Sequence, residues 1–533
     1  MARITDARPA GWAVGIAALL LALLAAVAPP ASAQRAEAPR VVETESGPVR
    51  GTQEYGYRLF QGIPYAAAPV GDLRFRAPRP VEPWTAVRDA TAPGEQCAQL
   101  VRRNNPETFG EDCLNLNVWT PAGGNTRRDD LPVMVWIHGG SWVYGTGANY
   151  DASKLVLQGD VVVVTINYRL GPIGFLAHPA LSAEGGANGS GNLALQDQQA
   201  ALRWVRDNIE AFGGDPRRVT IFGESAGASS VCANLVSPAS AGLFHRAIAQ
   251  SYSCAQDYAT QAQAEAAGVA FAGRVGCTDA ATAAACLRGK SAEQLLRAWT
   301  GGAFVAGNGL MPLQPSRALA TGSHAQVPLL HGNNRDENRL FVPLSYGTSI
   351  TAERYEQIVR SLYGANADQI LARYPVDAYP SPIIALSTLQ TDAPGGLSTC
   401  THVEAYELAS VRRRSERVYA YQFRDRTSPP FIDFPNFEDG AMHANELPYL
   451  FPRLFGGPLT RAQERLSDAM VGYWTTFARK GNPNGRGLPR WSRYREPRDV
   501  LGLALPEQGG IRPVDVAEES NCDFWADLRI GQD

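Results

Sequence analysis

The sequence predicts an α/β fold with a large, mostly parallel central sheet and helices on both faces. Three observations lead to this prediction. Pro132–Ile137 and Val161–Asn167 are continuous apolar runs, which are typical of strands buried on both faces of a parallel sheet. A helical pattern follows them, and Val219–Phe222 then forms another short apolar strand ahead of a second helix. Strands and helices that alternate in this order indicate a doubly wound sheet.

The length and composition favour one large globular domain. The chain has 533 residues, beyond the roughly 250–300 at which a single core usually stops growing, so it holds either two domains or one domain with insertions. With 45% hydrophobic and 19% charged residues, it is neither a disordered chain nor a coiled coil. The net charge of −3 gives no basic footprint for nucleic acid. The absence of repeats and low-complexity linkers from the sequence favours a single domain over residues 34–533.

Residues 1–33 have the pattern of a cleavable signal peptide. Two arginines precede the apolar run Gly11–Ala28, Pro29 and Pro30 end it, and Ala31–Ala33 supplies a small-residue cleavage site. We therefore expect cleavage after Ala33 and a secreted or periplasmic protein with no stable membrane insertion. The alternative is an uncleaved membrane anchor, because the apolar run has about the 18 residues that a span requires.

The other elements follow from local patterns. Short strands and turns with frequent prolines are expected from about residue 41 to 118. Gln196–Phe212 carries apolar residues at helical spacing, and two glycines end it. Alanine-rich helical segments between residues 261 and 299 indicate an insertion outside the sheet. Further expected elements are strands at Val327–Leu330 and Val418–Phe423 and helices at Ala352–Tyr363 and Arg461–Lys480.

Residues 223–227 (GESAG) form a GxSxG sequence between a predicted strand and a predicted helix. The pentapeptide alone is a weak signal, but this position is where a nucleophile elbow must lie. Small flanking residues avoid collisions with the strand and the helix, and the helix N-terminus directs free N–H groups at the site. Ser225 is therefore the candidate nucleophile. A solvated serine in an ordinary glycine-rich turn is the alternative.

Residues 138–142 (HGGSW) come directly after the strand 132–137. Small residues at this point allow backbone N–H groups to approach a substrate oxygen, as an oxyanion hole requires. Gly140, Ser141 and, from the elbow, Ala226 would supply three converging donors. The alternative is a plain glycine turn with His138 as a hydrogen-bonded core residue.

A serine nucleophile also requires a histidine oriented by a carboxylate. In enzymes with this elbow the chain order is serine, acid, histidine. The histidines after Ser225 stand at positions 245, 324, 331, 402 and 443. This order disfavours His245, since little carboxylate-bearing sheet precedes it, and leaves the other four open.

Eight cysteines follow the predicted signal peptide, at positions 97, 113, 232, 254, 277, 286, 400 and 522. Export makes disulfides possible, but eight cysteines allow 105 pairings and spacing does not choose among them. The pairs 97/113 and 277/286 are close enough in sequence to close short loops, and buried free thiols are also compatible. No paired CxxC or HxxxH spacing occurs in the sequence, so no metal site is expected.

The motifs together resemble the type-B carboxylesterase/lipase family, the α/β-hydrolase group that includes the cholinesterases. The resemblance covers nearly the whole mature chain. It implies an α/β-hydrolase fold in which helical insertions form a cap around an active-site gorge. The motifs that carry it are residues 60–66 (FQGIPYA), 69–75 (PVGDLRF), 111–117 (EDCLNLN), 167–171 (NYRLG), 222–227 (FGESAG), 474–484 and 522–525 (CDFW).

The resemblance also implies the catalytic triad. Residues 334–337 (NRDE) resemble the segment that supplies the acid, which indicates Glu337 rather than Asp336. Residues 440–443 (GAMH) resemble the segment that carries the histidine. The implied triad is Ser225, Glu337 and His443, in which a glutamate performs the role of the commoner aspartate.

Structural pairings are implied in the same way. The family pattern implies the disulfides Cys97–Cys113, Cys277–Cys286 and Cys400–Cys522, and the buried ion pairs Arg74–Glu111 and Arg169–Asp197. Cys232 and Cys254 are left over, and we expect them to be free thiols.

Two departures from the family pattern concern the loop of the implied acid and the expected substrate. Asn338 follows the implied acid where many relatives have glycine, so the local loop can differ. The loop between Cys97 and Cys113 contains no tryptophan, whereas cholinesterases carry there the tryptophan that binds choline by a cation–π contact. A cholinesterase is therefore disfavoured.

The predicted function is a serine carboxylesterase that hydrolyses small-molecule esters through an acyl-enzyme, without a cofactor. A lipase for long acyl chains, an amidase and a non-catalytic binding relative are the alternatives, since a fold alone does not settle function. Binding relatives typically lack a triad member, and here all three residues are present. The natural ester and the oligomeric state are not predicted.

Overall fold

The computed structural model describes residues 41–100, 109–122, 130–410 and 417–528. The predicted signal peptide lies outside these ranges. Within them, no helix combines the length and the apolar character needed to cross a membrane.

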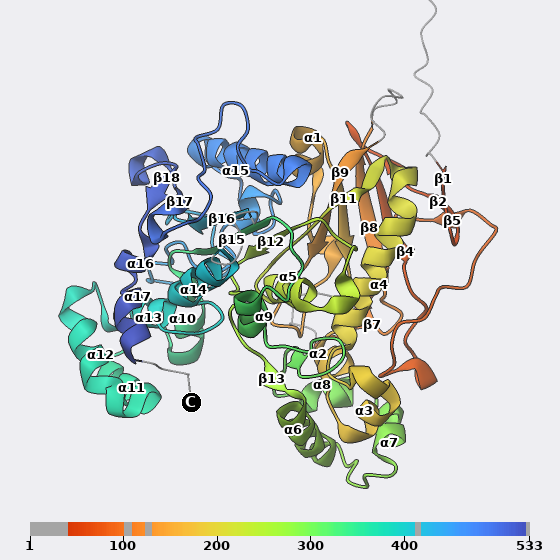
Figure 1. The fold of residues 1–533 in the computed structure, drawn as a ribbon, viewed down its shortest axis with the longest axis horizontal. Coiled ribbons are helices and arrows are strands. Elements are labelled where there is room, and N and C mark those ends of the chain that lie inside the picture. The colour runs from red at the N-terminus through yellow and green to blue at the C-terminus, as the bar shows by residue number, and fades with distance from the viewer. Residues whose placement is uncertain (1–40, 101–108, 123–129, 411–416, 529–533) are drawn as a thin grey trace, which may run out of the picture. The chain divides into compact units, whose positions relative to one another are not determined.

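An eleven-stranded sheet organises the described part of the chain (Figure 1). Seven strands run parallel, from β17 to β10 in spatial order, and antiparallel strands complete both edges, so the prediction of a mostly parallel sheet is confirmed. In spatial order the strands are β18 (Arg512–Val514), β17 (Val500–Leu503), β16 (Val418–Phe423), β15 (Leu329–Asn334), β12 (Arg246–Gln250), β11 (Gly214–Glu224), β9 (Leu131–Ile137), β10 (Val162–Ile166), β8 (Asn115–Pro121), β4 (Tyr57–Pro64) and β3 (Thr52–Gln53).

Helices cover both faces of this sheet, and β9 illustrates why. Val133 and Val135 belong to one hydrophobic core and Met134 and Trp136 to another, because successive side chains of a strand point to opposite faces. Both sets are fully buried, which explains the continuous apolar run in the sequence. The first core is completed by α4 (Leu193–Asn208), α5 (Ala226–Val236) and α14 (Thr399–Ser410), and the second by α1 (Ser153–Gly159) and α15 (Arg461–Lys480).

Most predicted elements have the expected position. The bounds of β16 and α15 agree with the prediction, as do those of α11 (Ala352–Tyr363). The strand expected at 327–330 instead begins at Leu329 and extends to Asn334. It is longer because the polar side chains at its end have buried partners: the amide of Asn333 donates to Thr399, and that of Asn334 donates to Glu446.

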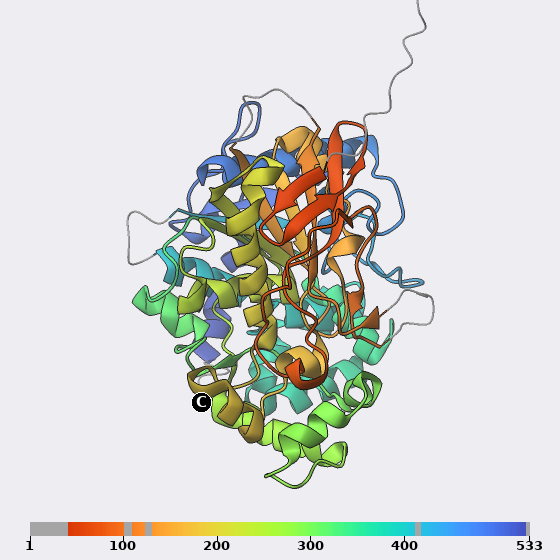
Figure 2. The same ribbon diagram turned by 90° about the vertical axis from the view of Figure 1, so that its right-hand side faces the viewer.

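Two groups of helices outside the sheet lie at the end of it where the parallel strands terminate (Figures 1 and 2). The first group is the alanine-rich insertion, which packs on α2 (Gly171–Phe175) and α3 (Pro179–Gly185). The second has a hydrophobic core of its own. The first group comprises α6 (Gln261–Arg274), α7 (Ala283–Gly289) and α8 (Ala292–Ala298). The second comprises α10 (Phe341–Tyr346), α11, α12 (Ala367–Arg373) and α13 (Pro382–Asp392).

Four disulfides connect the described elements, one more than expected. Cys97–Cys113, Cys277–Cys286 and Cys400–Cys522 are present, and the last of these joins α14 to α17 (Cys522–Leu528). The expectation that Cys232 and Cys254 are free thiols is wrong, because they form a fourth bridge. α5 packs along β12, so the two Cα atoms lie 5.1 Å apart, within the range of a disulfide. Their separation along the chain does not reveal this proximity.

Two ion pairs fix the loops on the site's side of the sheet. Arg169 and Asp197 are both fully buried, with Nη2 and Oδ1 2.6 Å apart. Arg74 binds Glu111 through two guanidinium nitrogens. These are the pairs that the family resemblance implies, and their geometry is structural rather than catalytic because neither lies in the cavity described below.

Candidate active site

Ser225 lies at a strained turn between β11 and α5. Its backbone has φ 57° and ψ −125°, a conformation that non-glycine residues rarely adopt. A Cβ atom on Gly223 would lie 2.6 Å from the carbonyl oxygen of Ile137, and one on Gly227 would overlap the same oxygen. The two glycines of the motif are therefore required by the close approach of β9 to the elbow.

The segment after β9 lies beside this elbow, because β9 and β11 are neighbouring parallel strands. Gly140 and Ser141 have φ angles of 106° and 53°, so the chain turns sharply there. Among the hydrogen bonds of the described residues, none uses the backbone N–H of Gly140 or Ser141. Ala226 is the first residue of α5, and its N–H has no partner within the helix. All three predicted donors therefore remain available at one end of the sheet.

Glu337 and His443 are in direct contact. Glu337 follows the end of β15, is fully buried, and its Oε2 lies 2.6 Å from His443 Nδ1. Its Oε1 accepts a hydrogen bond from the backbone N–H of Asn334 at 2.7 Å. The carboxylate is thus held by the strand end and in turn orients the imidazole.

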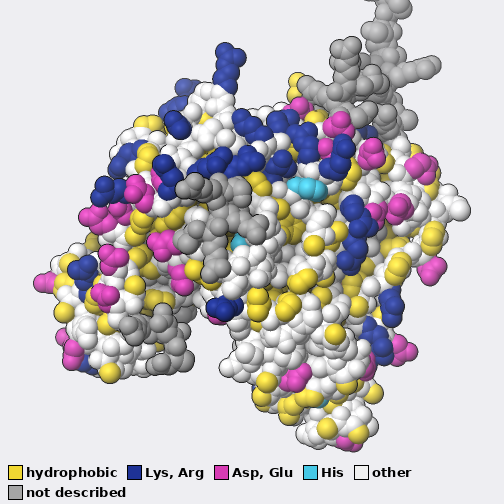
Figure 3. Space-filling view, viewed as in Figure 1, with side chains coloured by type: hydrophobic (Ala, Val, Ile, Leu, Met, Phe, Trp, Pro, Cys, Tyr) yellow, Lys and Arg dark blue, Asp and Glu magenta, His cyan; other side chains and the backbone are white. Residues whose placement is uncertain are grey.

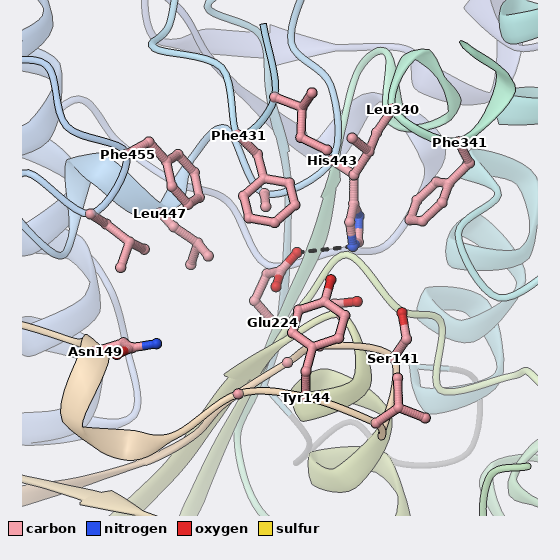
Figure 4. Close-up of a pocket in the computed structure, with 18 of the residues that line it drawn as sticks. Ser141, Tyr144, Asn149, Glu224, Leu340, Phe341, Phe431, His443, Leu447 and Phe455 are labelled. Carbon is pink, nitrogen blue, oxygen red and sulfur yellow. Dashed lines mark ion pairs between the residues drawn. The ribbon is translucent and has the colours of Figure 1, made fainter. Parts of the chain in front are cut away.

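A second carboxylate faces the opposite nitrogen of the ring. Glu224 Oε1 lies 3.1 Å from His443 Nε2 (Figure 4). Burial alone would lower the pKa of His443, but Glu224 and then Glu337 outweigh it and raise that pKa to about 9. For the carboxyl group of Glu224 the effect of burial is opposite, because burial disfavours the charged form, and it raises the pKa of Glu224 to about 8. The two groups titrate as a coupled pair.

The contacts of the described residues include no hydrogen bond between the Ser225 hydroxyl and His443, whose Nε2 faces Glu224 instead. Both residues nevertheless line the same cavity. Catalytic hydrogen bonds are often long before substrate binds. The sequence motif contains Glu224 only as a variable position of GxSxG, so its contact with the histidine was not predicted. Its position directly before the nucleophile was the available signal.

The cavity has a volume of about 830 Å³ and an apolar wall. Glu224 and His443 lie at its centre with Tyr144 beside them, and Phe431, Phe455 and Leu447 lie to one side and Phe341 to the other (Figure 4). The two helical groups outside the sheet also contribute to the wall. The apolar side chains that line the cavity are Leu100, Val143, Leu296, Trp299, Leu340, Phe341, Leu344, Phe431, Ile432, Leu447, Leu454 and Phe455.

Other candidates lie outside the cavity. Asp336 binds Arg426 and Arg339, with oxygen–nitrogen distances of 3.0 and 3.3 Å, and accepts the backbone N–H of Ala441, so it anchors loops. His331 and His402 are fully buried against each other, and burial lowers both pKa values. No group of three metal-ligating side chains occurs in the described ranges.

The fold places the protein in a class: it is an α/β-hydrolase with a serine at the elbow. The chain belongs to the carboxylesterase family, whose family model, described as "Carboxylesterase family", matches residues 38–525. The para-nitrobenzyl esterase of Bacillus subtilis is 39% identical over 86% of this chain and 93% of its own length. The pyrethroid hydrolase Ces2e of Rattus norvegicus is 36% identical over 87% of this chain and 86% of its own length.

Solved structures of relatives agree with this assignment. A thermophilic PNB esterase superposes with a TM-score of 0.75 at 34% identity and covers 92% of this chain and 99% of its own. A second PNB esterase has the same TM-score at 36% identity and covers 91% and 99%. The protein is therefore a carboxylic ester hydrolase that acts on small-molecule esters.

Proposed function

We propose that Ser225 is the nucleophile, His443 the general base and Glu337 the orienting acid of this esterase. The contact between Glu337 Oε2 and His443 Nδ1 at 2.6 Å carries the proposal, because it fixes the ring with Nε2 directed at the cavity that Ser225 lines. The fully buried carboxylate stabilises the imidazolium that forms during the reaction.

The reaction takes place in two halves. Ser225 attacks the ester carbonyl while His443 takes its proton, and the N–H groups of Gly140, Ser141 and Ala226 bind the tetrahedral oxyanion. His443 then gives the proton to the leaving alcohol. A water molecule, deprotonated by the same histidine, attacks the acyl-enzyme and releases the carboxylic acid.

The cavity supports neutral, apolar esters as substrates. Its wall carries aromatic and aliphatic side chains, and among the described residues that line it there is no arginine or lysine to hold an anionic acyl group. The name of the bacterial relative refers to a para-nitrobenzyl ester, whose aromatic alcohol suits a wall that includes Phe341 and Phe431. A long-chain lipase is the second candidate, because the same apolar wall is compatible with an alkyl chain.

A series of p-nitrophenyl esters, from acetate to palmitate, tests the assignment. Wild type should peak at short acyl chains, and Ser225→Ala should lose at least a thousandfold in kcat. Ser323→Ala, an exposed serine away from the cavity, is the matched control and should retain full activity. A peak at palmitate would favour the lipase, and activity of Ser225→Ala within tenfold of wild type would exclude Ser225 as the nucleophile.

We also propose that export delivers this single-domain enzyme outside the reducing cytosol. Four disulfides among the described residues are typical of exported proteins. N-terminal sequencing of the mature protein should begin at Gln34, after cleavage behind Ala33. A mature chain that retains residues 1–33 would instead indicate an anchor.

A further inference from the structure

A band of basic side chains lies at the end of the sheet opposite the cavity. The space-filling view shows Lys and Arg gathered at the end of the molecule where α15 lies (Figure 3). Arg218 lies near the start of β11, Arg246 begins β12, and Arg417 directly precedes β16. We call the following residues the basic rim: Arg218, Arg246, Arg417, Arg479, Lys480, Arg486, Arg490 and Arg493.

Among the described residues, no carboxylate forms an ion pair with a side chain of the rim. Arg218 and Arg246 both donate to the backbone carbonyl of Arg479, Arg417 donates to that of Lys480, and Lys480 donates to that of Asn484. The carbonyls of Arg479 and Lys480, at the C-terminus of α15, and that of Asn484 beyond it carry only partial negative charge, in contrast to the carboxylates that pair with arginines elsewhere. Asp215 is a carboxylate close to this face, and Arg217 pairs with it at 3.2 Å.

Like charges crowd one another on the rim. Burial, followed by Arg218 and Arg417, lowers the pKa of Arg246, and its Nε and Nη1 are buried without a partner among the described residues. Arg486, Arg490 and Arg493 are exposed and have no ion pair with any described carboxylate. Since the whole chain has a net charge of −3, this concentration of positive charge is a local feature that suits an anionic partner.

Exposed apolar side chains adjoin the rim. Arg479 donates to the carbonyl of Gly159 at the end of α1, where Leu157 is 50% exposed. The turn between β3 and β4 lies against Leu157 and carries Tyr55, which is 96% exposed. Arginine beside tyrosine and leucine is typical of a surface that contacts lipid headgroups, since arginine binds phosphate and tyrosine favours the interfacial layer.

We propose that the basic rim, with Tyr55 and Leu157 at its margin, docks the mature protein peripherally onto an anionic phospholipid surface. The strands between the rim and the active site have five or six residues, so the two lie about 20 Å apart at opposite ends of the sheet. A docked molecule therefore keeps its cavity directed toward water, and it takes dissolved esters rather than the lipids beneath it.

Flotation with vesicles tests the docking. The full-length mature protein should float with vesicles of phosphatidylcholine containing about 30% phosphatidylglycerol, should not float with pure phosphatidylcholine, and should be released by about 1 M KCl. Each basic residue near an anionic bilayer contributes about fivefold in partition coefficient, so R486Q/R490Q/R493Q should lose about a hundredfold. R317Q/R354Q/R373Q, which removes three exposed arginines outside the rim, should change less than twofold.

The apolar margin separates a lipid surface from any other polyanion. Tyr55→Ser with Leu157→Ser should reduce vesicle partition severalfold without altering retention on heparin. If vesicle binding is unchanged in that variant, the occupant is a polyanion and not a membrane, and the proposal is wrong. Equal losses in the rim variant and its control would also overturn it. Hydrolysis of p-nitrophenyl acetate should be the same in all these variants, so this test does not depend on the role of Ser225.

Discussion

Replacing Glu224 with glutamine should lower the pH at which the enzyme becomes active. In the proposed mechanism His443 accepts the Ser225 proton only when the ring is neutral, and the charge of Glu224 is the largest single contribution that raises the pKa of the ring to about 9. Glutamine has the same size but no charge, so the cavity keeps its shape while this contribution is lost. The acidic limb of kcat/KM should therefore move to lower pH, because the limb reports the protonation of the coupled pair in the free enzyme.

The magnitude follows from the geometry. The pKa of His443 lies about 2.5 above its ordinary value. Four electrostatic contributions from three glutamates together raise it by at least this amount, so the largest of the four, the charge of Glu224, raises the pKa by more than about 0.6. Two unit charges 3.1 Å apart interact by about 5 kcal/mol at an effective dielectric constant of about 20, which limits the change to about 4. We expect the limb to move down by about 1 to 2 pH units.

The assay is kcat/KM for p-nitrophenyl acetate between pH 5 and 10, for wild type, Glu224→Gln and Glu446→Gln. Glu446 makes the smallest contribution to the pKa of His443, so its variant is the matched control and should shift the limb less. Near-UV circular dichroism establishes that both variants are folded. A limb that stays in place or moves to higher pH in Glu224→Gln would refute the electrostatic reasoning.

Four further variants test the triad acid, the elbow and the fourth disulfide. Glu337→Gln should lower kcat by about 10⁴, while Asp336→Asn should keep most of its kcat and lose thermal stability; stopped assays and melting curves would show the reverse if Asp336 were the acid. Gly227→Ala should yield little folded protein, because its Cβ overlaps the Ile137 carbonyl, and soluble yield measures this. Cys232→Ser with Cys254→Ser should lower the free energy of unfolding by about 3 kcal/mol in urea titrations, and an unchanged value would show that the bridge does not form.

The sequence predicted the parts of the structure that depend on local periodicity. β9 and β10 are buried on both faces, so their apolar runs indicated a parallel sheet, and the helix expected at 461–480 coincides with α15. The elbow was predictable for the same reason, since its glycines, serine and flanking elements are adjacent in the chain.

The features that sequence could not provide are contacts between distant segments. Spacing left four histidines open, and only the family resemblance selected His443, which meets Glu337 across 106 residues. The disulfide between Cys232 and Cys254 depends on how α5 packs against β12, and periodicity contains no such information. The same applies to Glu224, because its effect on the pKa of His443 depends on the distance between the two side chains, which only the structure shows.

The composition of the cavity wall indicates how the range of esters that this enzyme accepts could be altered. The proposed reacting groups lie on segments that follow β9, β11, β15 and β16, whereas Trp299 and Leu344 belong to the two helical groups outside the sheet. Part of the cavity wall is therefore separate in the chain from the proposed reacting groups. Variation in the helical groups can reshape the space offered to an acyl or alcohol group while the elbow remains intact. A library directed at those two segments would explore new esters without risking the nucleophile.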